Sequence, residues 1–345
     1  MDLEPTADQR AIQDAVRQLV ERESTPERVR TAEASGFDAR LWNYLRQMGA
    51  VEVLIAAEPG GAGSGVLDLV LVAQEAGRRV ACVPLVESAV AARALADGLD
   101  RDGGPIAKML TRALEGQAIV VFAPGPAVDG VAILLNGGAA ADAVICLDGD
   151  EFVLAASARP PTATRTLGFT AAASRDSAGI AVDRVVVARG REAHEAWATA
   201  LAHWQLGTAG VLVGIAVAAI EIAAEYARER RQFGVAIGSF QVIQQALADS
   251  CIAVEGSELL VRESAWRADH DIDGWRGMAS MAFLHAGETA VQACERALHV
   301  HGGYGYTLEY DIQLFLRRAK ALSLSQGDPE PLWEQIGSAA VAARS

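Results

Sequence analysis

The sequence predicts an α+β protein in which helices come first, strands follow and helices return. Up to about residue 103, apolar residues recur at three- and four-residue steps, which is the period of amphipathic helices. Short β-branched runs separated by Gly, Pro and Asp continue to about residue 190, and long helical periods then resume. We therefore expect an N-terminal helical domain over 1–103, a reduced β domain over 104–190 and a C-terminal helical bundle over 191–345.

The first region is expected to contain at least three helices and one loop. Apolar residues place a helix over 6–23, and the same pattern recurs over 37–45 and 67–78. Between the last two, residues 58–65 are rich in glycine and indicate a loop.

The middle region is expected to form an antiparallel β unit. Its strand candidates are residues 118–122, 131–135, 143–147 and 185–187. Strands do not alternate with helices here, and no GxGxxG motif follows a strand, so a doubly wound dinucleotide-binding fold is not expected.

Composition limits the possible partners and the cellular compartment. The net charge of −14 argues against a nucleic-acid or anionic-membrane partner, because phosphates are repelled. The four cysteines are far apart and form no CxxC pair, which favours a reducing cytoplasm over a disulfide framework or a zinc site. The acidic N-terminus does not resemble a signal peptide. Residues 206–220 are too few to span a membrane and predict a helix buried in the bundle.

Two segments of the last region contain residues suited to ligand binding. Residues 226–234 are a basic cluster in which Arg230 either complements a helix C-terminus or presents a planar, charged fork to a phosphate. Residues 299–306 contain glycines that allow a ligand to approach the backbone, although an ordinary turn between helices has the same composition. His299 and His301 lack further ligands in the sequence around them, so we expect no metal site.

Together these segments resemble the flavin-dependent acyl-CoA dehydrogenase family. The pattern RxQFGxxIxxFQ begins at Arg230, GGYGYTxEY begins at Gly302, and an AK pair ends at Lys320. The N-terminal segments ADQRAIQDAVRQLV, EPGGAG and LDLVLVAQEAGR are similar to the first domain of that family. The resemblance implies a C-terminal four-helix bundle and an FAD cofactor shared at a subunit interface. It implies FAD contacts at the following residues: Arg230, Gln232, Phe233, Ile237, Phe240, Gln241, His299, Gly302 and Gly303.

The resemblance also identifies the places where a catalytic base is expected. Members of the family use a carboxylate to remove the α-proton of an acyl-CoA. Counting from the motifs places this base at Gln326 or, in some members, at Trp204, and neither residue has a carboxylate. Asp328 is a candidate for a displaced base, and we otherwise expect no catalytic residue in this chain.

The β domain also departs from the family. Residues 121–126 stand where members have the segment facing the flavin ring, and the chain then reaches residues 137–142 almost directly. The groups that act on a neighbouring subunit's flavin are thus retained, while those for the chain's own flavin are reduced.

The resemblance therefore implies a subunit of a heteromeric FAD-dependent acyl-CoA dehydrogenase. The expected partner is a catalytic paralogue in an α2β2 assembly, and the expected substrate is an acyl-CoA, with sterol side-chain CoA esters suggested by similar actinobacterial enzymes. Two alternatives stay open at this point. The chain is either a self-sufficient homo-oligomeric dehydrogenase with a displaced base such as Asp328, or a structural family member that binds neither flavin nor CoA.

Overall fold

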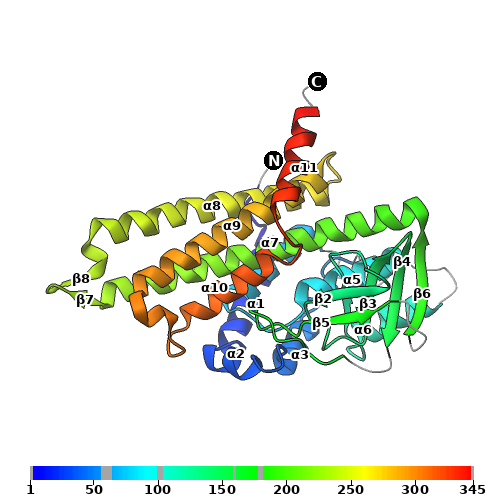
Figure 1. Ribbon diagram of the computed structural model, residues 1–345, viewed down its shortest axis with the longest axis horizontal. Coiled ribbons are helices and arrows are strands. Elements are labelled where there is room, and N and C mark those ends of the chain that lie inside the picture. Colours follow the sequence, from blue (N-terminus) through cyan, green and yellow to red (C-terminus); the bar gives the residue numbers. More distant parts are fainter. Residues whose placement is uncertain (1–2, 56–63, 99–103, 158–160, 178–181, 343–345) are drawn as a thin grey trace. The chain divides into compact units, whose positions relative to one another are not determined.

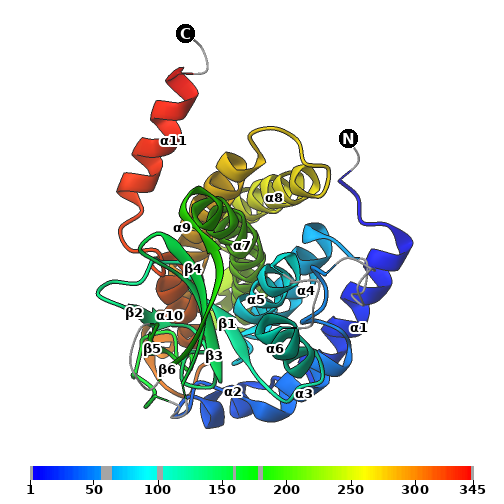
Figure 2. The same ribbon diagram turned by 90° about the vertical axis from the view of Figure 1, so that its right-hand side faces the viewer.

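The computed structural model describes residues 3–55, 64–98, 104–157, 161–177 and 182–342, and Figures 1 and 2 show its elements. In these ranges the helices are α1 (Ala7–Glu23), α2 (Pro26–Ala32), α3 (Ala39–Gln47), α4 (Val66–Arg78), α5 (Leu85–Asp97), α6 (Pro105–Leu114), α7 (Gly190–Glu229), α8 (Gln241–Asp269), α9 (Trp275–His301), α10 (Ile312–Ser323) and α11 (Glu330–Ala342). Two short 3-10 helices are η1 (Ile237–Ser239) and η2 (Gly302–Tyr306). The strands are β1 (Val120–Phe122), β2 (Val131–Leu135), β3 (Ala143–Asp148), β4 (Glu151–Ser157), β5 (Ala173–Asp176), β6 (Val182–Arg189), β7 (Arg231–Gln232) and β8 (Val235–Ala236).

The predicted order of helices, strands and helices is confirmed. The chain divides into two compact units, which we call the bundle unit (1–26, 70–81 and 208–345) and the sheet unit (27–69 and 82–207). The domain boundaries at 103/104 and 190/191 stay a prediction. Most of the glycine-rich segment 58–65, which is expected to be a loop, lies outside the described residues, because the structure describes only residues 64 and 65 of it.

In the bundle unit, glycines let α4 and α7 meet backbone to backbone. A Cβ atom added to Gly214 would lie 1.9 Å from the Gln74 carbonyl oxygen, and one added to Gly77 would lie 2.1 Å from that of Val211. Any larger residue at these positions would push the helices apart. The second half of α7, together with α8, α9 and α10, forms the body of this unit (Figure 1).

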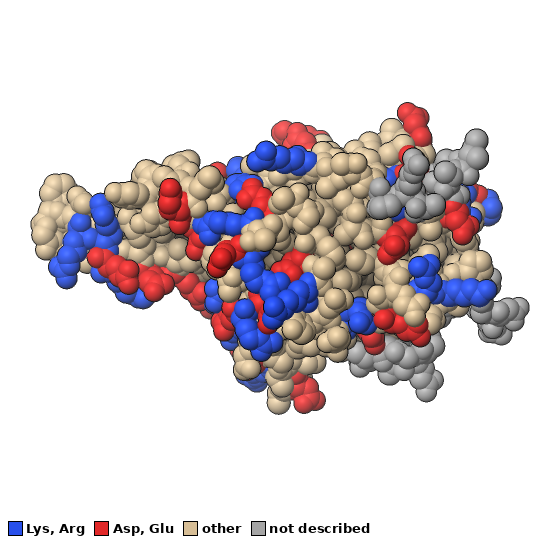
Figure 3. All heavy atoms as spheres, turned by 90° about the horizontal axis from the view of Figure 1, so that it is seen from below, with Lys and Arg blue, Asp and Glu red and all other residues tan. Residues whose placement is uncertain are grey.

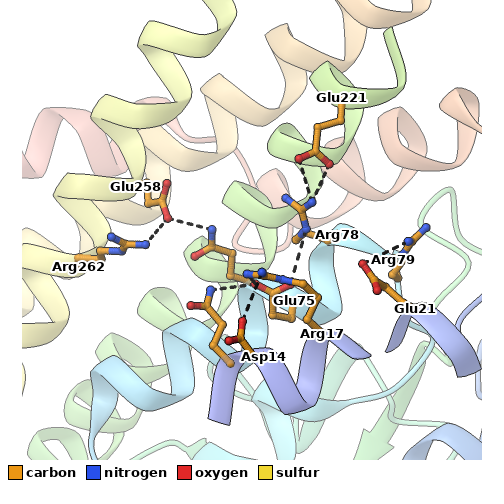
Figure 4. A network of polar contacts seen from close by, with 11 residues as sticks. Asp14, Arg17, Glu21, Glu75, Arg78, Arg79, Glu221, Glu258 and Arg262 are labelled. Atoms are coloured by element: carbon orange, nitrogen blue, oxygen red, sulfur yellow. Dashed lines mark hydrogen bonds and ion pairs between the residues drawn. The ribbon is translucent and has the colours of Figure 1, made fainter. Parts of the chain in front are cut away.

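A buried carboxylate connects α1, α4 and α7 within the bundle unit (Figure 4). Glu75 is 1% exposed and accepts hydrogen bonds from Arg17 at 3.0 and 2.9 Å and from Gln13 at 2.8 Å. Arg78 lies 3.6 Å from Glu75 and 2.7 Å from Glu221. The hydrogen bond that Arg17 donates to Glu75 raises the pKa of Arg17, so this guanidinium stays charged. Because each buried charge has a partner, this network orients the helices without leaving an uncompensated ion.

The sheet unit contains a mixed sheet, which corrects the expected antiparallel unit. Its strand order is β1-β3-β4-β6; β3–β4 and β4–β6 are antiparallel, but β1 and β3 are parallel. The four predicted strands all exist, but β2 leaves the main sheet and pairs with β5. The chain from β1 to β3 therefore crosses over through this ribbon, so both strands run in the same direction. Helix α5 contacts β1, and α6 contacts β6 (Figure 2).

The apolar segment 206–220 is part of α7, as predicted. By length and composition alone α7 could cross a membrane, but 78% of its most apolar window is buried inside the protein. It is therefore a core helix.

Candidate functional site

The end of α7 leads directly into a two-residue β-hairpin. β7 pairs with β8, and the turn residues Phe233 and Gly234 have φ values of 52° and 82°. Two positive φ values define a type I′ turn, which matches the twist of a hairpin. Glycine adopts this conformation freely, whereas phenylalanine is strained in it. Phe233 is nevertheless 93% exposed, and its ring lies edge-on to the ring of Phe240, with the two centres 6.3 Å apart.

Arg230 lies between α7 and this hairpin. Its N–H donates to the Tyr226 carbonyl at 2.8 Å, and its own carbonyl accepts from the N–H of Ile237 at 2.8 Å. Its guanidinium carbon lies 5.5 Å from the centre of the Tyr304 ring. Across the described ranges no carboxylate forms an ion pair with this guanidinium. A cation held against an aromatic ring without an anion of its own is suited to binding a phosphate.

An aromatic cluster places the glycine-rich turn η2 beside Arg230. His301 stacks on Tyr226 with ring centres 4.2 Å apart, and Tyr310 packs edge-on against both. His301 Nδ1 is 2.8 Å from the Ala297 carbonyl, which can only accept, so this nitrogen carries the hydrogen. Burial raises the pKa of Tyr226, partly offset by the charge of Arg230. The two segments singled out in the sequence therefore come together at one end of the bundle unit.

Gly302 and Gly303 are open to an approaching ligand. Gly302 ends α9 with a φ of 62°, and a Cβ atom added to either residue would have no neighbour within 4 Å. His299 is exposed one turn earlier and borders a groove of about 430 Å³ between α8 and α9. The groove is lined by Val242, Ile243, Ala246, Gln292, Glu295, Arg296, His299 and Val300.

The remaining predicted cofactor residues lie around the hairpin. Gln232 is exposed in β7, and Gln241 is exposed at the first position of α8. Ile237 and Phe240 are half-buried in and after η1. In Figure 3 the end that carries β7 and β8, on the left, has uncharged atoms at its tip and Lys and Arg side chains beside them. The surface around the hairpin therefore contains the Arg230 guanidinium, the exposed Phe233 ring and the accessible backbone of Gly302 and Gly303.

The two expected base positions are occupied in different ways. Trp204 is 0% exposed in α7, and its Nε1 donates to Glu87 Oε1 at 3.4 Å. Gln326 lies in the turn after α10. Asp328 is exposed, and its Oδ1 accepts from the N–H of Glu330 at 3.1 Å in the first turn of α11, as a capping side chain does.

Glu87 is a residue that the sequence reasoning missed. It is 6% exposed in α5 and also lies 3.5 Å from the Asn136 side-chain nitrogen. The available signal was a single carboxylate inside the apolar helix LVESAVAARAL. Its contact with Trp204 brings a carboxyl group beside an expected base position, but both side chains are buried.

Two other carboxylates on α7, Glu195 and Glu221, are already paired. Glu195 lies 3.7 Å from Arg191, and Glu221 lies 2.7 Å from Arg78. Glu195 is therefore part of an ion pair on the surface, and Glu221 belongs to the network around Glu75.

The sheet unit shows how the β region is shortened. Residues 136–142 form a turn that connects β2 to β3 with no strand between them. After β1, the Ala123 carbonyl accepts from Trp197 Nε1 at 3.2 Å. An indole from α7 thus lies against the segment that follows β1.

Within the described part of the chain, no cluster of three His, Cys, Asp or Glu side chains could hold a metal ion. His301 points to Tyr226 and Ala297, whereas His299 borders the groove, so the two histidines face different surroundings.

Comparisons with known proteins show sequence similarity over two regions of this chain. Residues 6–105 match the family described as "Acyl-CoA dehydrogenase, N-terminal domain", and residues 195–341 match "Acyl-CoA dehydrogenase, C-terminal domain". Acyl-CoA dehydrogenase IpdE2 of Mycolicibacterium smegmatis is 29% identical over 337 residues, which are 92% of this chain and 94% of that protein.

Two solved structures are similar over their full length. The ChsE4-ChsE5 complex from Mycobacterium tuberculosis has a TM-score of 0.85 at 27% identity and covers 99% of both chains. A steroid ACAD, the Tcur3481-Tcur3483 G363A variant, has a TM-score of 0.86 at 26% identity and covers 98% of this chain and 99% of that one.

Proposed function

This chain belongs to the acyl-CoA dehydrogenase family, whose members are oxidoreductases acting on CH–CH groups, and we propose that it is the supporting subunit of a heteromeric, FAD-dependent enzyme. A catalytic paralogue holds the flavin ring and carries the base, and the Arg230 hairpin of this chain completes the dinucleotide site. The observation that carries the proposal is that the surface around the hairpin, which we call the half-site, is open to solvent. Phe233 is strained and 93% exposed, and Arg230 beside it has no carboxylate partner among the described residues.

The residues at this surface fit part of FAD. A pyrophosphate needs a fixed cation, which Arg230 supplies, and a close approach to the backbone, which the space above Gly302 and Gly303 allows. Phe233 offers an aromatic face, and His299 offers a ring nitrogen at the groove between α8 and α9. Gln232 and Gln241 present exposed amides. The N–H of Ile237 donates to the Arg230 carbonyl, and the Phe240 ring lies edge-on to Phe233.

The chemistry that FAD would supply when bound is acceptance of a hydride from the β-carbon of the acyl-CoA thioester, and a carboxylate would remove the α-proton. The residues of this chain bind and orient, and none of them acts as the base. The Trp204 side chain is completely buried, and the Gln326 amide cannot accept the proton. Asp328 caps α11.

The relatives support a heteromeric assembly. The ChsE4-ChsE5 structure is a complex of two named subunits, and the Tcur3481-Tcur3483 protein is named a steroid ACAD. We therefore propose an α2β2 assembly with a catalytic paralogue, acting in the cytoplasm on a CoA thioester with a bulky, sterol-like acyl group.

The test is flavin absorbance and acyl-CoA oxidation of the chain purified alone and after co-expression with each acyl-CoA dehydrogenase paralogue of its source organism. We expect the chain alone to be colourless and inactive, and one pairing to yield a yellow, active complex. A yellow, active homo-oligomer would establish the self-sufficient alternative. A complex that contains no flavin and oxidises no acyl-CoA would establish the structural one.

A further inference from the structure

A cavity of about 490 Å³ lies within the sheet unit, where two segments far apart in the sequence meet. One segment is the turn after α2, residues 33–36, and the other lies before β5, within residues 163–170. This volume is typical of a small-molecule site. Most of the lining side chains carry a hydroxyl or a charge: Glu33, Ser35, Thr164, Arg165, Thr166 and Thr170.

The two segments are fixed to each other through their backbones. The N–H of Ala171 donates to the Gly36 carbonyl at 3.1 Å. Gly36 has a φ of 68°, and a Cβ atom added to it would lie 2.2 Å from the Ala171 nitrogen, so glycine is required for this approach. Phe169 has a φ of 42°, which is strained for this residue, and packing holds it there at 2% exposure. These constraints fix the walls of the cavity.

Three consecutive residues of the lining offer hydrogen-bond donors. Arg165 is exposed, and across the described ranges no carboxylate forms an ion pair with it. The Thr166 hydroxyl is buried and has no hydrogen-bond partner in that part of the chain, whereas a buried hydroxyl normally has one. The Thr164 side chain is exposed on the same segment. A guanidinium and a buried hydroxyl are thus unsatisfied at one place.

Other polar groups of the lining already have partners. Ser35 Oγ donates to the Phe37 carbonyl at 3.1 Å, and Thr170 Oγ1 donates to Asn136 Oδ1 at 2.9 Å. Glu33 also has a partner within the chain. The unused capacity of the cavity is therefore one positive charge with hydroxyl donors beside it, which is what an anion requires.

We propose that this cavity binds a phosphate monoester carried by a small hydroxylated molecule, with Arg165 and the hydroxyls of Thr164 and Thr166 around the phosphate. An arginine fork and hydroxyl groups form charge-assisted hydrogen bonds with phosphate oxygens. The three donor groups match the three terminal oxygens of a monoester, whereas a carboxylate has two. The polar lining favours a hydroxylated carrier over an acyl chain for the rest of the cavity. This site is separate from the half-site and needs no partner subunit.

Calorimetric titration of the full chain with ribose 5-phosphate tests the site. We expect saturable binding, and ribose without the phosphate should bind at least about tenfold more weakly. Arg165→Ala should weaken binding of ribose 5-phosphate by about 10- to 100-fold, and Arg165→Lys should restore only part of the affinity. The matched control, Arg191→Ala, removes an exposed guanidinium of the same unit outside the cavity and should leave the affinity unchanged.

The variant Thr166→Val separates ligand binding from folding. Valine has nearly the shape of threonine and lacks the hydroxyl, which bonds to nothing in the described chain. Without ligand, the unfolding temperature of this variant should therefore equal or exceed that of the wild type. Its affinity for ribose 5-phosphate should nevertheless fall by about 2- to 10-fold. Unchanged affinity would make the hydroxyl an unsatisfied group of the core and would contradict its role in the site.

CoA and 3′-dephospho-CoA distinguish two sources of the same phosphate chemistry, because only CoA has a 3′-phosphate monoester. Displacement of ribose 5-phosphate by CoA alone would identify the nucleotide end of a CoA thioester as the occupant. Displacement by neither would identify a free phosphorylated metabolite. Equal displacement by both would overturn the inference, as would failure of ribose 5-phosphate, inorganic phosphate and CoA to bind, or equal binding of them by Arg165→Ala. The flavin and activity measurements above decide the proposed function independently.

Discussion

The hairpin end of the bundle unit and the surroundings of Trp204 in the sheet unit differ in the exposure and the pairing of their side chains. At the hairpin, Phe233 is held in a strained conformation and left exposed, and Arg230 has no carboxylate partner in the described residues. In the second region the Trp204 indole is 0% exposed and donates a hydrogen bond to Glu87. The side chains of the first region lack partners that would cover them, whereas the side chain of Trp204 is buried and hydrogen-bonded within the chain. This difference supports the proposal that the hairpin end of this chain contributes to a site shared with a partner subunit.

The largest expected effect concerns the packed region. Trp204→Ala should lower the free energy of unfolding by about 3–5 kcal/mol, because it removes a completely buried indole and leaves a cavity. Chemical denaturation of the isolated chain measures this loss. The control is Trp333→Ala, whose side chain is 40% exposed and should cost far less. A small loss for Trp204→Ala would mean that this region is loosely packed and able to admit a ligand.

At the open end, Arg230→Ala should weaken FAD binding by the complex by about 1.5–3 kcal/mol, or about 10- to 100-fold, through loss of a charge-assisted phosphate contact. Arg230→Lys should restore only part of the affinity, because an ammonium lacks the planar fork. Arg228→Ala, at an exposed position one half-turn earlier, is the control. Flavin release followed by fluorescence measures these affinities. Equal affinities for wild type and Arg230→Ala would make the cluster a simple helix terminus.

A smaller and opposite pair of effects is expected at the hairpin turn. Phe233→Asn creates an Asn-Gly pair, the preferred sequence for a type I′ turn, and replaces phenylalanine with a residue that adopts a positive φ at a lower cost in energy. It should leave the isolated chain as stable as wild type, or more stable by up to about 1 kcal/mol. The same variant should lose flavin from the complex faster. Thermal denaturation and flavin release test the two halves separately, and lower stability would show that Phe233 serves the fold.

The smallest effects are expected at the displaced base candidates. Asp328→Asn should leave turnover of the complex within about twofold, because Asn caps a helix about as well as Asp. Loss of a true general base would lower turnover by a factor of roughly 10² to 10⁴. Gln326→Glu should create no activity in the chain purified alone. Steady-state turnover at equal flavin content decides both cases, and a large loss for Asp328→Asn would make this subunit catalytic.

The amino-acid sequence by itself determined the order of helices and strands, and it identified the two segments that we propose bind a ligand. Helical periodicity located α1 to within a residue, because an amphipathic face and the capping box at Thr6 are local properties. The absence of a carboxylate at Gln326 and Trp204 was also visible in the sequence, since it follows from spacing to motifs.

Only the tertiary structure decided how distant residues meet. It made β1 and β3 parallel, because β2 pairs with β5 and the chain crosses over between them. It brought Arg230 to Tyr304 and Glu87 to Trp204, which are 74 and 117 positions apart in the sequence. It also gave Phe233 a positive φ and 93% exposure. No local pattern predicts this, because phenylalanine is enriched in strands and is usually buried. Contacts between residues far apart in sequence depend on packing of whole elements, and local periodicity carries no information about that packing.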